Sequence, residues 1–477
     1  MSGSHDASSP AARVAGSPGG TAVSTGDAGF AYRRDRFQEM IEDVLAQARQ
    51  LGATDAAAEV SEGSGLSVSV RKGELENVER NRDKSLGVTV YVGSRRGNAS
   101  TSDFSPAALA QTVRAAWDIA RFTAEDTAAG LPDEADLASA AEASRDLALF
   151  HPWAIDAAQA AQIALRCEQA AFDTDRRIAN SEGAAVSAQQ SHFWAGNSRG
   201  FRGGYASSRH SISVAPIAGR GQGMQRDAWY TSMRDPAALA SPEAVGRYAA
   251  ERALSRLKST RIPTCEVPVL FEAPVAAGLL GALVQAISGG ALYRKASFLL
   301  DSLGRQILPL HVDIDEDPYL ERGKGSAPFD DEGVLTRARR VVDGGIIQGY
   351  FLSSYSARKL GMRTTGHAGG SHNLAMTSRL TETGDTLEAM IARLGRGLFV
   401  TDLMGQGVNH VTGDYSRGAS GFWVEDGRIV RPVEEITIAG NLRQMLGDIV
   451  AIGADVYETG SKAVGSVLID RMKVAGS

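Results

Sequence analysis

Residues 272–304, EAPVAAGLLGALVQAISGGALYRKASFLLDSLG, form the centre of the predicted C-terminal half. Their first part predicts a helix, because apolar side chains recur at helical spacing: Val275, Leu279, Leu280, Leu283, Val284 and Ile287. Pro274 suits the first helical turn, and Gly289 and Gly290 end the helix. Gln285 is the only polar side chain inside, so we expect a helix buried on nearly all sides. It offers no residue for metal or acid–base chemistry.

The composition is typical of a soluble globular protein, with 43% hydrophobic and 22% charged residues in a chain of 477. A net charge of -6 argues against nucleic-acid binding by bulk electrostatics. No apolar run is long enough to span a bilayer, and the N-terminus lacks the pattern of a secretory signal. We therefore expect a cytoplasmic protein with no direct membrane or nucleic-acid contact.

Periodicity and composition divide the chain into three parts. Residues 1–30 are rich in Ser, Gly, Ala and Pro and predict a disordered tail. Residues 31–262 predict a layered N-terminal α/β domain, and residues 263–477 a β-rich C-terminal domain. Because strands and helices do not alternate regularly, the expected fold class is α+β.

Two N-terminal runs alternate strictly between apolar and other residues, and predict half-buried strands. One contains Leu66, Val68 and Val70, and the other extends over residues 86–92. Between them, the sequence GELENVERNRD predicts a charged, solvated connection.

Metal-ligand spacing is weak throughout the chain. His367 and His372 form the one close histidine pair, but Gly369 and Gly370 lie between them, so no helix supports the pair. Backbone hydrogen bonding or a peptide-facing role is favoured over a metal site. Cys167 and Cys265 lack metal-type spacing, and we expect both to be small buried hydrophobes.

An acidic run at residues 313–317 matches the first ligands of a calcium loop. Pro318 and Lys324, however, stand where that loop needs Gly and Glu. The run therefore predicts a solvated acidic loop.

Residues 196–200, GNSRG, match the nucleophile elbow of serine hydrolases. The elbow needs a helix after it, whereas the following sequence alternates like a strand, so a hairpin turn is favoured. An arrangement of Ser198 with His210 and an aspartate in space stays open.

The glycine-rich residues 405–421 lack the lysine of a phosphate-binding loop. Glycines here suit close approach to a bound chain, although turns that close a β-rich core are the alternative. We expect the following side chains to face a peptide or a partner: His367, His372, Asn409, His410, Asp414, Tyr415 and Arg417.

Four motifs carry a family resemblance: GGALYRKASFLLDSLG (289–304), GGSHNL (369–374), LMGQGVNHVTGDYSRGASGFWVEDG (403–427) and EEITIAGNL (434–442). From about residue 35 to the C-terminus the chain resembles the PmbA/TldE branch of the TldD/PmbA family. The resemblance implies an α/β N-terminal part and a β-rich C-terminal part.

In that family the TldD-type subunit resembles a zinc metallopeptidase with an HExxxH helix and a distant Cys ligand. It assembles with a PmbA/TldE-type subunit, and peptides reach the zinc through an enclosed space. Here the corresponding helix reads GALVQA (281–286), and residues 457–465 offer no Cys. The resemblance therefore implies no catalytic or metal-binding residue and no cofactor in this chain, with zinc in the partner.

The expected function is that of a non-catalytic subunit, inactive alone, which completes the chamber and helps bind unfolded peptides for proteolysis or peptide maturation. Its expected partner is a TldD-type zinc-bearing subunit, or a second copy of this chain when it is alone. Two alternatives stay open: an autonomous hydrolase with an unrecognised nucleophile, and a gyrase-linked regulatory binding protein.

Overall fold

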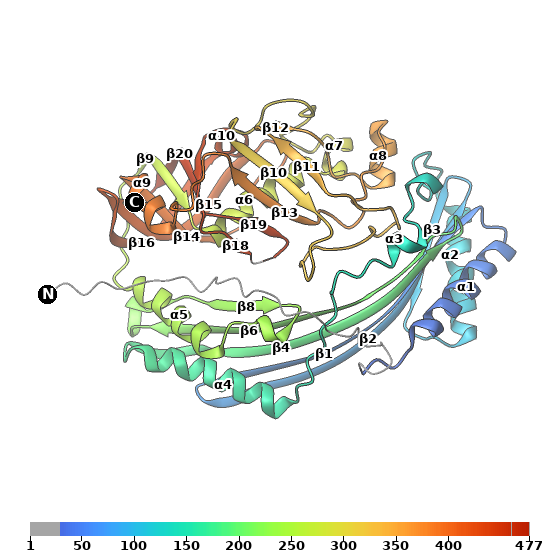
Figure 1. Ribbon diagram of the computed structural model, residues 1–477, viewed down its shortest axis with the longest axis horizontal. Helices are drawn as coiled ribbons and strands as arrows, with labels where there is room; N and C mark the ends of the chain where they lie inside the picture. The colour runs from blue at the N-terminus through green and yellow to red at the C-terminus, as the bar shows by residue number, and fades with distance from the viewer. Residues whose placement is uncertain (1–28, 459, 477) are drawn as a thin grey trace.

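The computed structural model describes residues 29–458 and 460–476. The tail expected over residues 1–30 lies outside these residues, except for Gly29 and Phe30. The described chain is α+β, with one large curved sheet in its N-terminal half and two smaller sheets in its C-terminal half (Figure 1). None of the described helices is long and apolar enough to cross a membrane.

The large sheet has the strand order β3-β2-β1-β4-β6-β7, with β5 paired to β4 and β8 paired to β6. Its pairings are antiparallel. Its strands are β1 (Asp55–Arg71), β2 (Glu74–Val92), β3 (Arg95–Thr101), β4 (Ile178–Asn197), β5 (Arg202–Gly203), β6 (Ala206–Ala218), β7 (Gln225–Arg226) and β8 (Trp229–Met233).

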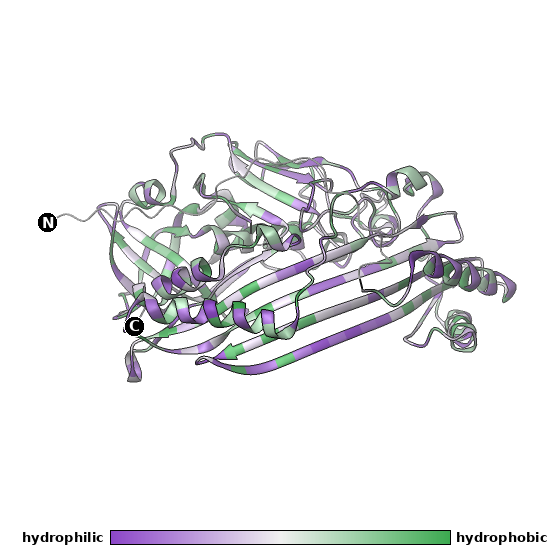
Figure 2. Ribbon diagram, turned by 60° about the horizontal axis from the view of Figure 1, so that its bottom comes forward, coloured by the Kyte–Doolittle hydropathy of each residue, from purple (hydrophilic) through white to green (hydrophobic). Residues whose placement is uncertain are grey.

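Helices cover the convex face of this sheet, and the C-terminal half lies on the concave side (Figure 1). The covering helices are α1 (Arg34–Gln50), α2 (Pro106–Phe122), α4 (Ala157–Thr174) and α5 (Pro242–Ser255). The even-numbered side chains of β1, such as Val60 and Val68, are buried against these helices. Figure 2 shows the resulting bands of hydrophilic and hydrophobic residues along the strands.

The charged connection expected between the first two strands is wrong. Lys72 and Gly73 adopt positive φ angles of 54° and 78° and close a tight hairpin, so the sequence GELENVERNRD continues as β2. Residues 71–83 are exposed, which suits polar side chains. Residues 74–85 of β2 pair with β1 on one side. Strand β3 pairs only with residues 86–92, so the outer side of residues 74–85 has no partner strand in the described chain.

The C-terminal half contains two six-stranded sheets, ordered β12-β11-β10-β13-β19-β18 and β16-β15-β14-β9-β20-β17. The first comprises β10 (Val312–Asp317), β11 (Arg339–Asp343), β12 (Ile346–Ile347), β13 (Asn373–Ser378), β18 (Tyr457–Glu458) and β19 (Lys462–Val464). The second comprises β9 (Cys265–Phe271), β14 (Gly397–Met404), β15 (Asp414–Glu425), β16 (Arg428–Asn441), β17 (Ile449–Ile452) and β20 (Val467–Ala475).

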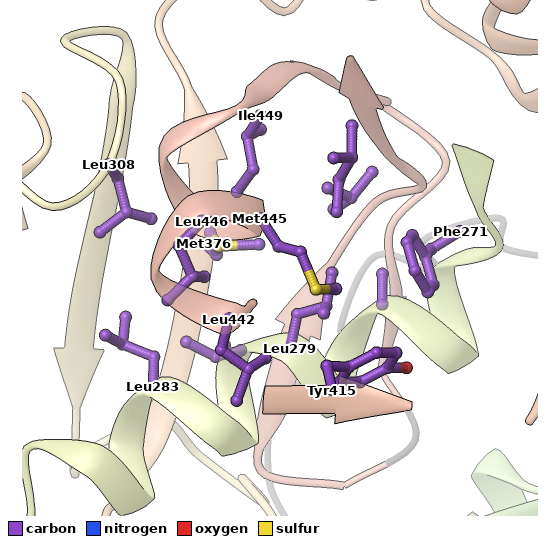
Figure 3. Close-up of a cluster of buried hydrophobic side chains, with 14 of the residues drawn as sticks. Phe271, Leu279, Leu283, Leu308, Met376, Tyr415, Leu442, Met445, Leu446 and Ile449 are labelled. Atoms are coloured by element: carbon purple, nitrogen blue, oxygen red, sulfur yellow. The ribbon is translucent and has the colours of Figure 1, made fainter. Parts of the chain in front are cut away.

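Short helices connect these strands, and α6 (Ala273–Ala286) packs in the C-terminal core. The others are α7 (Gly289–Tyr293), α8 (Ser354–Leu360), α9 (Leu387–Leu394) and α10 (Leu442–Gly447), whereas α3 (Ala140–Ala143) lies between α2 and α4 in the N-terminal half. Figure 3 shows Leu279 and Leu283 of α6 beside Leu442 and Met445. This packing confirms the expected helix and its core role.

Burial of α6 on nearly all sides is wrong, however. Gly278 and Gln285 are exposed, and Gly281 and Ala282 are half-buried, so one stripe of the helix stays open. These positions are three or four residues apart and share one helical face. Small side chains along this stripe leave the backbone accessible.

A buried ion pair connects α5 to the beginning of α6. Arg252 donates to both carboxylate oxygens of Glu272, at 2.7 and 3.1 Å. Glu272 directly precedes α6, and its side chain is buried. Removing Arg252 would leave the buried Glu272 carboxylate without its ion-pair partner, which is strongly destabilising. The pair therefore fixes the position of α6 against the N-terminal half.

Leu283→Ala should lower the free energy of unfolding by about 2–5 kcal/mol, because it removes a fully buried side chain from the core. Gln285→Ala, on the open stripe, should change it by less than about 0.5 kcal/mol. Urea denaturation followed by circular dichroism measures both. A Leu283→Ala cost below about 1 kcal/mol would show that α6 is peripheral.

Candidate functional site

Glu316, His367 and His372 form a buried polar group in the C-terminal half. Glu316 lies on β10, and the histidines lie in the segment that leads to β13. The solvated acidic loop expected for residues 313–317 is therefore wrong: these residues form a strand, and its pairing with β11 and β13 buries Glu316. The three residues offer ligand atoms within 4.8 Å of one another, so they could hold a metal ion.

The present hydrogen bonds of this group satisfy its charges without a metal. Glu316 Oε2 lies 2.9 Å from His367 Nε2 and accepts from Arg339 Nε at 2.8 Å. Glu316 Oε1 accepts from the backbone N–H of His372 at 2.8 Å. The two ring nitrogens of His372 lie 3.3 and 3.1 Å from the carbonyls of Gly325 and Gly366.

A zinc ion would therefore have to displace existing partners. Zinc needs a free nitrogen lone pair on each histidine and an available carboxylate oxygen. Arg339, a permanent cation, contacts Glu316 and lies 3.3 Å from His367 Nε2. The group fits a hydrogen-bonded ion-pair network better than a metal centre. The absence of a metal in this chain stays a prediction.

Burial by itself raises the pKa of Glu316, but His367 and Arg339 outweigh it and lower the pKa to about 2. Burial lowers the pKa of His367, and its hydrogen bond to Glu316 opposes that effect only in part. Both shifts favour an ionised Glu316 beside a neutral His367 at neutral pH. Because the pKa values of Glu316 and His367 are both lowered in the folded state, each group makes the folded state lose stability as the pH falls.

The other expected peptide-facing residues lie in a separate segment, which comprises the loop between β14 and β15 and the first residues of β15. Asn409 and Asp414 are exposed, His410 and Arg417 are half-buried, and Tyr415 is buried in the core of Figure 3. The side chain of Asn409 accepts from Val411 N and Thr412 N, which shapes the loop. Among the described residues, no hydrogen bond or ion pair joins this segment to the histidine pair.

Two buried atoms of this segment have no hydrogen-bond partner in the described chain: His410 Nδ1 and Arg417 Nε. Buried polar atoms normally find partners. Arg417 does donate through a terminal nitrogen to the carbonyl of Leu403, at 3.3 Å. The segment therefore combines an ordered loop with unused hydrogen-bonding capacity.

Ser198 has structural partners rather than a catalytic base. It lies in the turn after β4, donates to Asp55 Oδ1 at 2.8 Å and accepts from Ala56 N at 3.1 Å. His210 bonds the carbonyl of His151 and belongs to the face of β6 that is buried against the helices. A nucleophile needs a base within hydrogen-bond reach, so the hairpin-turn interpretation of this sequence fits the geometry.

The concave side of the large sheet contains a cavity of about 470 Å³, which we call the acidic cavity. Its wall includes the aromatic side chains Phe193, Phe201, Tyr205 and Phe329 and the acidic side chains Glu59, Glu62, Asp83, Asp330 and Asp331. The ring of Phe329 meets the other three rings at centroid distances of 6.1, 4.8 and 5.8 Å. The cavity thus lies between the large sheet and the loop of the C-terminal half that contains Phe329.

Three carboxyl groups of this cavity, those of Glu59, Asp330 and Asp331, have a raised pKa. Burial and repulsion from Asp331 raise the pKa of Glu59. Burial raises the pKa of Asp330 to about 7, even though Oδ1 and Oδ2 accept three backbone N–H groups at 2.9 Å. These acids were not among the site residues expected from the sequence. The alternation of β1 puts Glu59 on the face opposite Val60, and this pattern could have indicated its place on the concave side.

Three family profiles match the chain. They describe PmbA/TldA metallopeptidase domain 1 over residues 56–120, the central domain over residues 150–257, and the C-terminal domain over residues 264–476.

Curated relatives cover nearly the whole chain. The metalloprotease PmbA of Escherichia coli O157:H7 is 49% identical over 442 residues, which are 92% of this chain and 97% of that protein. The metalloprotease PmbA homolog of Haemophilus influenzae is 46% identical over 93% of this chain and 97% of its own length. The metalloprotease TldD homolog of Haemophilus influenzae is 27% identical over 40% of this chain and 42% of its own length.

Solved structures share the fold. A crystal structure from Bacteroides thetaiotaomicron, described as a proposed modulator of DNA gyrase, superposes with a TM-score of 0.86 and 26% identity, covering 93% of this chain and 99% of that one. TldE from Thermococcus kodakarensis superposes with a TM-score of 0.77 at 19% identity, over 92% of this chain and all of that one (100%).

The purified chain should bind no stoichiometric zinc, because Arg339 and two carbonyls already occupy the Glu316, His367 and His372 group. Metal analysis after exposure to zinc and dialysis measures this. One zinc per chain that disappears in His372→Ala, and persists in the control His151→Ala, would contradict the expectation.

Asp330→Asn should remove a pH dependence of stability. The Asp330 carboxyl ionises near pH 7 in the folded chain but near pH 4 when unfolded, so ionisation favours the unfolded state as the pH rises between these values. From pH 5 to pH 8 the wild type should lose about 2–3 kcal/mol of unfolding free energy relative to Asp330→Asn. Denaturant titrations that give parallel profiles for both proteins would rule this out.

Proposed function

This chain belongs to the PmbA/TldD metallopeptidase family, and we propose that it is the non-catalytic subunit of a TldD/PmbA-type zinc metallopeptidase complex. In this role it completes the chamber of the complex and helps hold unfolded peptides for proteolysis or maturation. A TldD-type partner supplies the zinc, and the complex works in the cytoplasm.

The observation that carries the proposal is the chemistry of α6. The resemblance places the family's HExxxH helix here, yet residues 281–286 read GALVQA. None of these side chains can ligate zinc, and the open stripe of the helix consists of Gly278, Gly281, Ala282 and Gln285. The helix keeps its place in the core while presenting an unreactive surface. This combination supports a structural role beside a catalytic partner.

The concave face of the large sheet supports a peptide-holding role. Its side chains are mostly small and polar, and we call it the serine-lined face: Ser61, Gly63, Gly65, Ser67 and Ser69 of β1, Ser187, Gln189 and Ser191 of β4, and Ser207, Ser211 and Ser213 of β6. None of these residues is fully buried, although the C-terminal half lies over this side. Small side chains leave room for a chain, and their hydroxyl groups can bond a peptide backbone.

The free edge of β2 is consistent with the binding of a partner chain. Unpaired strand edges are sites for strand addition. Residues 74–85 lack an outer neighbour in the described structure, and Leu75 and Val78 on this edge are 57% and 41% exposed. A second subunit that pairs here would extend the sheet and cover these apolar side chains.

The segment between β14 and β15 is a second surface that we assign to the peptide or the partner. Met404 and Val411, at its two ends, are 47% and 53% exposed. Asp414 and Arg417 offer opposite charges beside them. The buried Tyr415 would support this surface from below rather than touch the peptide, and the buried His367 and His372 belong to the separate group around Glu316.

A mixture of this chain with a TldD-type zinc subunit should degrade reduced, unfolded casein, and a chelator should stop the reaction. This chain alone should cleave nothing, because α6 lacks the groups that bind zinc and activate water. Peptide release measured by mass spectrometry reports both. Chelator-sensitive cleavage by this chain alone, or an equally active TldD-type subunit without it, would overturn the proposal.

Asp414→Ala together with Arg417→Ala should lower the activity of the assembled complex about tenfold, as expected when central contacts of a binding surface are lost. Arg428→Ala, an exposed residue at the tip of the β15–β16 hairpin, is the control and should have no effect. Size-exclusion chromatography checks assembly. Full activity in a double variant that folds and assembles would make the segment a scaffold only.

A further inference from the structure

Three cations meet on the concave side of the large sheet, and we call them the basic cluster: Arg209, Arg234 and Lys324. Arg209 lies on β6 in the row of side chains that faces away from the helices. Arg234 directly follows Met233, which pairs with His210, so the two arginines are neighbours across the strands. Lys324 reaches the same place from the C-terminal half.

Arg234 fixes the geometry of this cluster. Its guanidinium donates to the carbonyls of Gly323 at 3.0 Å, Lys324 at 3.2 Å and Ser208 at 3.4 Å. Lys324 Nζ donates to the carbonyl of Glu458 at 2.9 Å. Carbonyl oxygens have no net charge, so the bonds of Arg234 position its guanidinium without neutralising it.

No carboxylate of the described chain forms an ion pair with Arg209 or Arg234. Asp235 follows Arg234, but its carboxylate lies beside His151 at 3.8 Å and Arg322 at 3.4 Å. Arg209 is half-buried and, among the described residues, makes neither a hydrogen bond nor an ion pair. Its five N–H donors are therefore available.

Burial and the proximity of like charges lower the pKa of two of these cations, and both keep their charge at neutral pH. Burial and the nearby arginines lower the pKa of Lys324 to about 8, although Glu458 acts in the opposite direction. Burial and Arg209 lower the pKa of Arg234 to about 10. Like charges that are held together in a partly desolvated site favour an anion that completes the set.

We propose that the basic cluster binds the carboxylate of a peptide that lies along the serine-lined face. The inference rests on the proposed function, since it supposes that this face holds peptides. A carboxylate here accepts charge-assisted hydrogen bonds, for which the planar fork of Arg209 is well suited. Arg234 acts mainly as a positioning residue, because three of its bonds hold the surrounding backbone.

The acidic cavity lies at the other end of the same surface. Tyr205 interacts electrostatically with Arg234 on one side and with Asp331 and Glu59 on the other. Arg209 pairs with Gln189, which pairs with Gly65 on β1, six residues from Glu59. Six residues of strand span about 20 Å. A hexapeptide in extended form thus fits with its carboxyl end at the basic cluster and its amino end toward the acids.

The test compares acetylated alanine–serine hexapeptides with a free C-terminal carboxylate or a C-terminal amide, titrated into the full chain by calorimetry. The free acid should bind about tenfold tighter than the amide, because charged hydrogen bonds are lost in the amide. A third peptide, amidated but with an internal glutamate, distinguishes a C-terminal from a side-chain carboxylate. Binding of that peptide as tightly as the free acid would widen the site to any peptide carboxylate.

Arg209→Gln and, separately, Lys324→Met should each reduce the preference for the free acid, while Arg209→Lys retains part of it. Arg247→Gln, an exposed arginine on the convex side in α5, is the control and should keep the preference. Equal affinity for acid and amide, no binding of either, or a preference untouched in folded Arg209→Gln and Lys324→Met would overturn the inference.

These binding measurements need no partner subunit, so their outcome is separate from that of the cleavage test. If this chain prefers the free-acid peptide but does not change the activity of a TldD-type partner, the proposed function is refuted while the carboxylate site stands.

Discussion

The architecture depends on one constraint: successive side chains of a β-strand point to opposite faces of the sheet. Along β1, β4 and β6 most apolar side chains fall on the face that α1, α2, α4 and α5 cover. The opposite face consequently carries mainly serine, glycine and a few charges, apart from the aromatic side chains at the acidic cavity. A slip of one residue would exchange the two faces. The same register that stabilises the N-terminal half therefore creates its polar, accessible surface.

The C-terminal half depends on α6, which connects packing and function. Leu279, Leu280 and Leu283 belong to the main core, and the ion pair of Arg252 with Glu272 holds the beginning of the helix against the N-terminal half. The opposite stripe has only small or neutral polar side chains. The helix thus packs in the core on one side, and residues 281–286 offer no side chain that can ligate zinc on the other.

Charged groups inside this protein fall into two kinds. Glu316 is neutralised by Arg339, and its remaining oxygen accepts a backbone N–H, so burial of this charge is compensated. By contrast, Glu59 in the acidic cavity lies near Asp331, and Arg234 in the basic cluster lies near Arg209, so these charges have neighbours of the same sign. Compensated charges specify the packing of a core, whereas uncompensated charges in an accessible surface mark places where a ligand of opposite sign is favoured.

The sequence by itself determined the α+β class and the core role of residues 273–286, because these follow from local periodicity and residue type. It did not reveal β2 as a long edge strand. Charged residues are tolerated in this strand because solvent reaches both of its faces, and that exposure is set by the tertiary structure. Nor did it reveal the burial of Glu316, which arises from pairing with β11 and β13. The acidic cavity and the basic cluster combine residues of both halves, such as Glu59 with Asp331 and Arg209 with Lys324. Only tertiary structure decides such neighbours, because packing of the two halves sets their distances and the sequence separation does not.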